Sequence, residues 1–98
     1  KVSNLSGRKM KVSYTKDKNV TGYEIQYSPY KNFLYYTQTV KVKGKNNTSK
    51  TIKNLTKNQT YYVRVRSYVK SGSNTVAGNW SSVKKVKIMI LQSPAPIQ

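Results

Sequence analysis

The sequence predicts an all-β protein, a seven-stranded antiparallel β-sandwich. Apolar and polar residues alternate with a period of two in several short segments, as in strands that bury one face. About seven such segments are separated by turn-forming residues roughly every 8–12 positions, and none shows helical periodicity. The composition is rich in Lys, Asn, Thr, Ser, Val and Tyr and poor in Ala and Leu, which favours strands and turns over helices.

The segment 55–68 gives the strongest strand signal in the chain, because it alternates without a break from Tyr61 to Tyr68. One face of the predicted strand holds Tyr61, Val63, Val65 and Ser67. The other face holds Tyr62, Arg64, Arg66 and Tyr68. We expect the first face to pack in the core and the second to lie on the outer surface of a sheet.

Three strands are expected earlier in the chain, over residues 1–6, 9–14 and 22–28. The first alternates poorly. The second and third alternate regularly, and their inward side chains are predicted to be Met10, Val12, Tyr14, Tyr23, Ile25 and Tyr27. Pro29 ends the third strand because proline has no N–H to donate to a ladder.

Three more strands are expected over residues 37–43, 49–55 and 80–90. A long loop over residues 70–79 precedes the last of them. In that last strand Val86 and Ile88 are in phase, whereas Val83 is out of phase. A bulge or bend near Ser82 is therefore predicted.

The length of 98 residues suits one domain, which we place over residues 1–91. Residues 92–98 hold two of the three prolines and no charge, so they are expected to form a linker or tail. The chain opens with Lys1 rather than Met, which suggests a piece of a longer protein. The longest clean apolar run, residues 88–91, is too short for a membrane span.

The residue types present argue against catalysis and cofactors. The sequence contains no Cys, which excludes a disulfide, a cysteine zinc site and a thiol nucleophile. It also contains no His, and its only carboxylates are Asp17 and Glu24. General acid–base chemistry and a calcium or magnesium cage both depend on such groups, so we expect no enzyme, no metal site and no cofactor.

The formal net charge is +17, from 19 Lys and Arg against two acids. A charge of this size attracts polyanions and keeps a protein soluble, but it does not specify a fold. Cell-wall teichoic acid, acidic glycans, anionic lipid surfaces and nucleic acids are the candidate polyanions. A solvated, self-repelling surface with no specific partner is the other interpretation.

The outer face of the segment 61–68 is the candidate binding face. Together with its expected neighbours it consists of Tyr62, Arg64, Arg66, Tyr68, Lys85 and Lys87, extended at the sheet edge by Lys41 and Lys43. The neighbouring strand on the other side is expected to present Glu24 and Gln26. Arginines beside exposed rings can stack on sugars or bases while they neutralise acidic groups. The alternative is ordinary cross-strand pairing, with Glu24 opposite an arginine and the tyrosines covering the sheet.

A second candidate is the aromatic cluster at residues 33–36. It would be either an exposed patch for a glycan or a neighbouring domain, or a set of rings that folds over the sandwich edge; we expect the second arrangement.

Four motifs in order resemble the fibronectin type III family over nearly the whole chain. They are Met10-x-Val12-x-Tyr14, Gly22-Tyr23-x-Ile25-x-Tyr27, Leu55 with Tyr61-x-Val63-x-Val65, and Trp80-Ser81. The resemblance implies an immunoglobulin-like sandwich with structural roles for Tyr14, Tyr23, Leu55, Tyr61 and Trp80. It also implies that the Tyr61 hydroxyl hydrogen-bonds the backbone a few residues upstream. Tyr14 departs from the family pattern, which usually has Trp at this position.

The resemblance implies a non-catalytic module that acts as a spacer, presents neighbouring domains of its own chain, or contacts other proteins. The Lys-rich style is similar to modules in secreted or surface proteins of Gram-positive bacteria, and a monomer is expected. The alternative function is binding of anionic polymers, teichoic acid or acidic glycan, through the basic sheet face. Nucleic acid is the least favoured partner because no nucleic-acid motif accompanies the charge.

Overall fold

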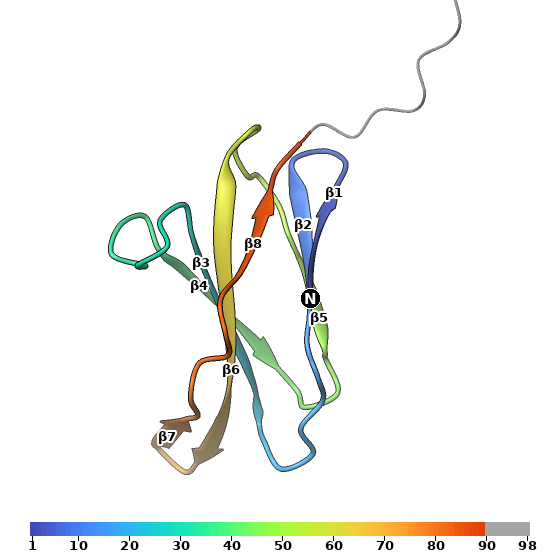
Figure 1. Ribbon diagram of the computed structural model, residues 1–98. Coiled ribbons are helices and arrows are strands. Elements are labelled where there is room, and N and C mark those ends of the chain that lie inside the picture. The colour runs from blue at the N-terminus through green and yellow to red at the C-terminus, as the bar shows by residue number, and fades with distance from the viewer. Residues whose placement is uncertain (90–98) are drawn as a thin grey trace, which may run out of the picture.

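The computed structural model describes residues 1–89 and shows two antiparallel sheets packed face to face (Figure 1). One sheet has the order β1-β2-β5, and the other has the order β4-β3-β6-β7, with β8 also pairing β6. The strands are β1 Val2–Leu5, β2 Lys9–Ser13, β3 Gly22–Ser28, β4 Gln38–Lys43, β5 Ser49–Ile52, β6 Thr60–Ser71, β7 Asn74–Ala77 and β8 Lys84–Lys87. The all-β sandwich predicted from the alternation is therefore confirmed.

The core lies between the sheets and is built from the alternate residues of their strands. In the middle of the larger sheet Ile25 of β3 stands opposite Val65 of β6, and Tyr27 stands opposite Val63. The buried core residues are Met10, Val12, Ile25, Val42, Ile52, Leu55, Tyr61, Val63 and Ile88. Removing this apolar surface from water is the main stabilisation available to a chain without disulfides.

The expected loop over residues 70–79 is instead a hairpin. β6 runs for 12 residues to Ser71, which pairs with Asn74 at the start of β7. The two-residue connection begins with Gly72, whose φ of 60° is readily adopted by glycine. Residues 1–89 thus form eight strands, one more than the seven expected, and the additional strand is β7.

The last strand is shorter than expected, because regular pairing begins only at Lys84. Ala77 pairs with Tyr68, and Lys84 pairs with Val63. From the first pair to the second, this segment advances by seven residues (84 − 77) while β6 advances by only five (68 − 63). The two additional residues shift the pairing register of the segment around Ser81, whose N–H donates to the Val65 carbonyl at 2.8 Å. The register therefore shifts where the bulge near Ser82 was predicted.

Tyr61 joins β6 to the connection that crosses from the other sheet. Its hydroxyl oxygen accepts a hydrogen bond from the Thr56 N–H at 3.0 Å, five residues upstream. The adjacent Leu55 is 2% exposed, and its N–H donates to the Arg8 carbonyl at 3.0 Å. The arrangement corresponds to the upstream backbone bond that the resemblance implies for Tyr61.

Tyr14 and Tyr23 pack against each other at one end of the core, with ring centroids 4.6 Å apart. The Tyr14 hydroxyl donates to the Asn47 carbonyl at 2.8 Å, and the Tyr23 hydroxyl donates to the Lys45 carbonyl at 2.8 Å. Burial, and secondarily Tyr23, raises the pKa of Tyr14 to about 12, so its hydroxyl stays protonated at neutral pH. The ring that replaces the usual Trp therefore has a partner for its polar atom.

The predicted tail, residues 92–98, lies outside the described residues, as do Ile90 and Leu91. The boundary at residue 91 therefore stays a prediction. No helix in the described part of the chain has the length and apolar character needed to cross a membrane.

Replacing Tyr61 by Phe should lower the free energy of unfolding by about 1 kcal/mol, because the Thr56 N–H loses its acceptor while the ring stays packed. Chemical denaturation measures the loss. The matched control is Tyr62→Phe, which removes a hydroxyl from the half-exposed neighbour on the opposite face and should change stability less. Equal midpoints for the Tyr61 variant and the parent would contradict this role.

Candidate functional site

The candidate binding face lies on the outer side of the larger sheet, where β6 runs between β3 and β8. Pairing places Arg66 opposite Glu24 and Arg64 opposite Gln26. On the other side of β6, Lys85 stands opposite Tyr62. The neighbours of the arginines predicted from the alternation are therefore the neighbours in the structure.

The two arginines stack on aromatic rings supplied by loops. The Arg64 guanidinium lies 4.1 Å from the Phe33 ring centroid and 4.6 Å from that of Trp80. Arg66 lies 4.1 Å from the Trp80 centroid. Trp80 thus contacts both cations, and together these four side chains form what we call the arginine stack.

Both arginines also pair across the strands. Arg66 Nε donates to Glu24 Oε1 at 2.8 Å, and the two side chains are 30% and 15% exposed. Arg64 Nε donates to Gln26 Oε1 at 2.7 Å. Burial, and secondarily Arg66, lowers the pKa of Arg64. The cross-strand arrangement considered as the alternative is thus present, and each guanidinium has only part of its hydrogen-bonding edge left for a ligand.

Tyr68 is not the exposed ring that we expected, since it is only 3% exposed. It stands opposite Gly22, where the missing side chain leaves room for its ring. A Cβ at Gly22 would clash with the Val42 carbonyl oxygen and lie 2.8 Å from the Tyr68 hydroxyl. Lys41 Nζ covers the ring at 4.9 Å from its centroid. Tyr68 therefore belongs to the packing of the sheet rather than to an open surface.

Lysines flank the arginine stack on both sides. Lys41 and Lys43 of β4 stand on the same face as Glu24 and Gly22, and both are exposed. Lys85 and Lys87 of β8 are exposed on the opposite flank. Of the cations proposed for the candidate binding face, these lysines are the ones that remain open to solvent.

The sequence reasoning missed the contacts of Trp80 and Phe33 with the arginines. Trp80 was assigned to the beginning of the last strand, whereas it lies in the irregular segment before β8. The rings at residues 33–36 were expected to fold over the sandwich edge, and only Phe33 does so. Leu34, Tyr35 and Tyr36 are 69%, 61% and 77% exposed. Alternation carries no information about such loops.

Among residues 1–89, no group of three or more His, Cys, Asp or Glu side chains could hold a metal ion. Glu24 is occupied by Arg66, and Asp17 lies in the exposed loop between β2 and β3, where its Oδ1 accepts the Asn19 N–H at 2.9 Å.

The fold and the arrangement around Tyr61 define an immunoglobulin-like sandwich of two antiparallel sheets. The family model for the fibronectin type III domain matches residues 1–84, so the chain belongs to the fibronectin type III family. Members of this family are generally non-catalytic binding or spacer modules. A comparison with curated proteins gave no match.

Solved structures agree with this assignment. The chain is similar to the fn3 domain of human contactin 1, with 20% identity over 98% of this chain and 78% of that one and a TM-score of 0.76. It is also similar to the chicken CNTN1 FN1-FN3 domains, with 26% identity over 91% of this chain and a TM-score of 0.76. It spans only 28% of that chicken protein fragment. The fn3 domain of human collagen alpha-1(XX) is similar at 17% identity, 97% and 85% coverage and a TM-score of 0.65.

The arginine stack should contribute measurable coupling between Arg64 and Trp80. In a double-mutant cycle with Arg64→Gln and Trp80→Leu, we expect a coupling free energy of about 0.5–1 kcal/mol, the scale of a cation over an indole ring. Chemical denaturation of the four proteins gives the value. A parallel cycle with Lys85→Gln and Trp80→Leu should be additive, and additivity in the Arg64 cycle would disprove the coupling.

Proposed function

We propose that the chain is a non-catalytic module that spaces and orients neighbouring domains in a larger exported protein. The observation that carries the proposal is the direction of the outer strands. β1 and β8 lie side by side, joined by a hydrogen bond from Asn4 Nδ2 to the Met89 carbonyl at 3.0 Å, and both run the same way (Figure 1). A chain that enters through β1 and leaves through β8 therefore advances along the sandwich.

The strand pairing of the module also makes it stiff along its long axis. Its central strand β6 has 12 residues and is about 40 Å long at ~3.3 Å per residue. Tyr61 ties this strand to the crossover before it, and β6 pairs with three other strands. A spacer needs such stiffness, because a flexible segment of equal length has a much smaller mean span.

The proposed location is outside the cell, in a secreted or cell-surface protein, and the proposed source is a Gram-positive bacterium. The absence of Cys is compatible with an exported bacterial protein, and the Lys-rich composition has the style of such modules.

The spacer role is tested in the full-length protein that contains this module. Deleting the module should bring the flanking domains closer together, by at most about 40 Å, the length of its central strand. Fluorescence energy transfer between labels on those domains measures the change. Replacement by an unrelated fibronectin type III domain should restore the distance, whereas an unchanged distance after deletion would remove the proposal.

A second candidate function is binding of an anionic polymer, such as teichoic acid or an acidic glycan, through the basic sheet face. The specific observation in its favour is the exposure of Lys41, Lys43, Lys85 and Lys87 on both flanks of the arginine stack. Because Lys is a hydrated point charge, this surface suits diffuse attraction better than shaped recognition.

Heparin binding at low salt tests this second function. Changing the four flanking lysines to Gln should weaken binding about tenfold and flatten its dependence on salt, because fewer counterions are released. The control is matched in charge: changing Lys9 and Lys11 of β2, in the other sheet, to Gln should have a smaller effect than changing Lys41 and Lys43 of β4 alone. Equal losses in both variants would mean that only net charge matters and would exclude a specific face.

A further inference from the structure

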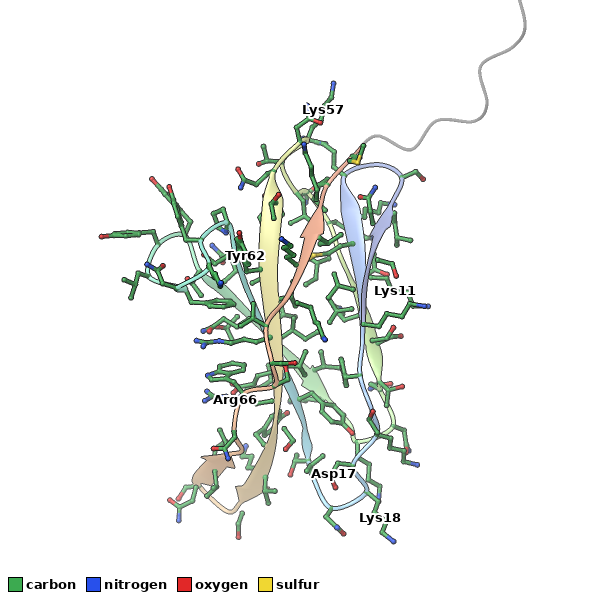
Figure 2. All side chains as sticks on the ribbon, viewed as in Figure 1. Lys11, Asp17, Lys18, Lys57, Tyr62 and Arg66 are labelled. Atoms are coloured by element: carbon green, nitrogen blue, oxygen red, sulfur yellow. The ribbon has the colours of Figure 1, made fainter. Side chains whose placement is uncertain are left out.

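The loop between β3 and β4, residues 29–37, displays aromatic and apolar side chains away from the sandwich (Figure 2). Tyr30 is 47% exposed, and Leu34, Tyr35 and Tyr36 are more exposed still. Tyr30 and Tyr36 stack with centroids 6.3 Å apart and an interplanar angle of 24°. Large apolar surface gathered on one loop is uncommon at the surface of a soluble protein and points to a contact site.

This loop has a defined shape. The fully buried Ser28 accepts the Tyr30 N–H through Oγ at 3.0 Å and donates through the same atom to the Tyr35 carbonyl at 2.8 Å. Thr37 Oγ1 donates to the Phe33 carbonyl at 2.9 Å. These bonds fix both ends of the loop, so its rings are held in place before any ligand arrives, which reduces the entropy lost on binding.

Two non-glycine residues of the loop adopt the left-handed region, Phe33 with φ 57° and Tyr36 with φ 52°. Such conformations are uncommon for aromatic residues and cost of order 1 kcal/mol or more each. The stacking of Phe33 on Arg64 and the hydrogen bonds of the loop hold them in place. In this conformation the Tyr36 ring forms part of the wall of a groove.

The groove, which we call the end groove, lies between this loop and the connection from β5 to β6. It has a volume of about 510 Å³, within the range of small-molecule sites. Its lining combines rings with amide and hydroxyl groups and includes Tyr27, Tyr36, Gln38, Lys53, Asn54 and Gln59. None of these residues belongs to the candidate binding face.

The polar groups of the end groove are open to a ligand. Gln38, Lys53 and Asn54 are exposed, and Gln59 uses its Nε2 to donate to the Thr60 carbonyl at 2.9 Å, which leaves its amide oxygen. Burial, and secondarily Tyr61, raises the pKa of Tyr27, so its hydroxyl remains a donor at neutral pH. Amides and phenols can both donate and accept, as a ligand with many hydroxyls requires.

We propose that the end groove binds an acidic oligosaccharide, with Tyr36 stacking on a sugar ring, Gln38 and Asn54 bonding its hydroxyls, and Lys53 pairing with a carboxylate. The face of an aromatic ring is electron-rich and attracts the polarised C–H groups on one side of a pyranose. Among the described residues that line the groove, Lys53 is the single charged side chain, which favours an acidic over a neutral sugar. The proposal goes beyond the spacer role and concerns a different surface.

The charge of the chain argues against a second copy as the occupant. Two copies joined at this groove would bring together formal charges of +17 each, and only Asp17 and Glu24 are acidic. Glu24 is paired with Arg66, and Asp17 lies at the opposite end of the sandwich from Lys57 (Figure 2). Neither acid is therefore placed to neutralise Lys53 of another copy at the groove.

The test is a titration of the 98-residue chain with hyaluronan hexasaccharide, in which every second sugar carries a carboxylate, and with the uncharged hexa-N-acetylchitohexaose. Nitrogen-15 NMR spectra recorded at about 0.3 M salt, where diffuse attraction is screened, locate the site. We expect the side-chain amide signals of Gln38, Asn54 and Gln59 to shift. The acidic sugar should bind more tightly than the neutral one, and Lys53→Gln should remove most of that difference.

Three variants distinguish binding in the end groove from non-specific binding to the exposed loop. Tyr36→Ala should weaken binding about tenfold, the effect of losing ~1.4 kcal/mol. Gln38→Ala, on the regular strand β4, should weaken it less without altering the loop. Tyr35→Ala is the matched control, since this ring is exposed on the same loop but does not line the groove, and should leave affinity within about twofold.

Four results would overturn the proposal: no binding of either sugar, an equal loss in the Tyr35 and Tyr36 variants, equal binding of a hexaglutamate peptide, or dimerisation of the chain that Tyr36→Ala abolishes. The spacer role would stand in each case, because its test measures the distance between flanking domains.

Discussion

The pairing of β3 with β6 is the constraint on which the other features depend. The register runs without interruption from Gly22 opposite Tyr68 to Ser28 opposite Tyr62. Because side chains alternate, a slip of one residue would move every core residue of one strand to solvent. The same register decides which side chains meet outside the core, since it aligns Glu24 with Arg66. Ser28, at the end of this pairing, then holds the loop that carries the exposed rings. Core, sheet face and end groove therefore share one alignment.

The strands that bury one face could be predicted from sequence. β3 has the bounds that were expected for it, and β2, β4 and β6 each begin and end within a few residues of their own expected bounds. The agreement arises because burial of one face enforces alternation. β7 was missed because all four of its residues are exposed, so nothing in its pattern distinguishes it from a loop. It forms because β6 extends past the core and offers an unpaired edge, which the chain meets after a tight turn. That is a property of the assembled sheet and not of the segment.

The candidate face could be predicted only in part. Cross-strand partners follow from alternation and strand order, so Glu24 and Gln26 beside the arginines were expected and found. Loop contacts do not follow from either, and Phe33 and Trp80 reach the arginines from irregular segments. The exposure of Tyr68 was predicted wrongly because its ring is buried in the space beside Gly22, a residue of the neighbouring strand that has no side chain. The end groove combines two segments distant in sequence, residues 27–38 and 53–61, and no local motif indicates it.

The ion pair between Glu24 and Arg66 has a consequence for the environments this module tolerates. Acid denaturation of most proteins comes from protonating many paired carboxylates or charging buried histidines. This chain has no His and two carboxylates, so complete neutralisation of its acids raises the formal charge only from +17 to +19 (17 + 2). Just one ion pair is lost from the described residues, and it lies on the surface of a sheet rather than in the core. The stability of this sandwich should therefore change little on acidification.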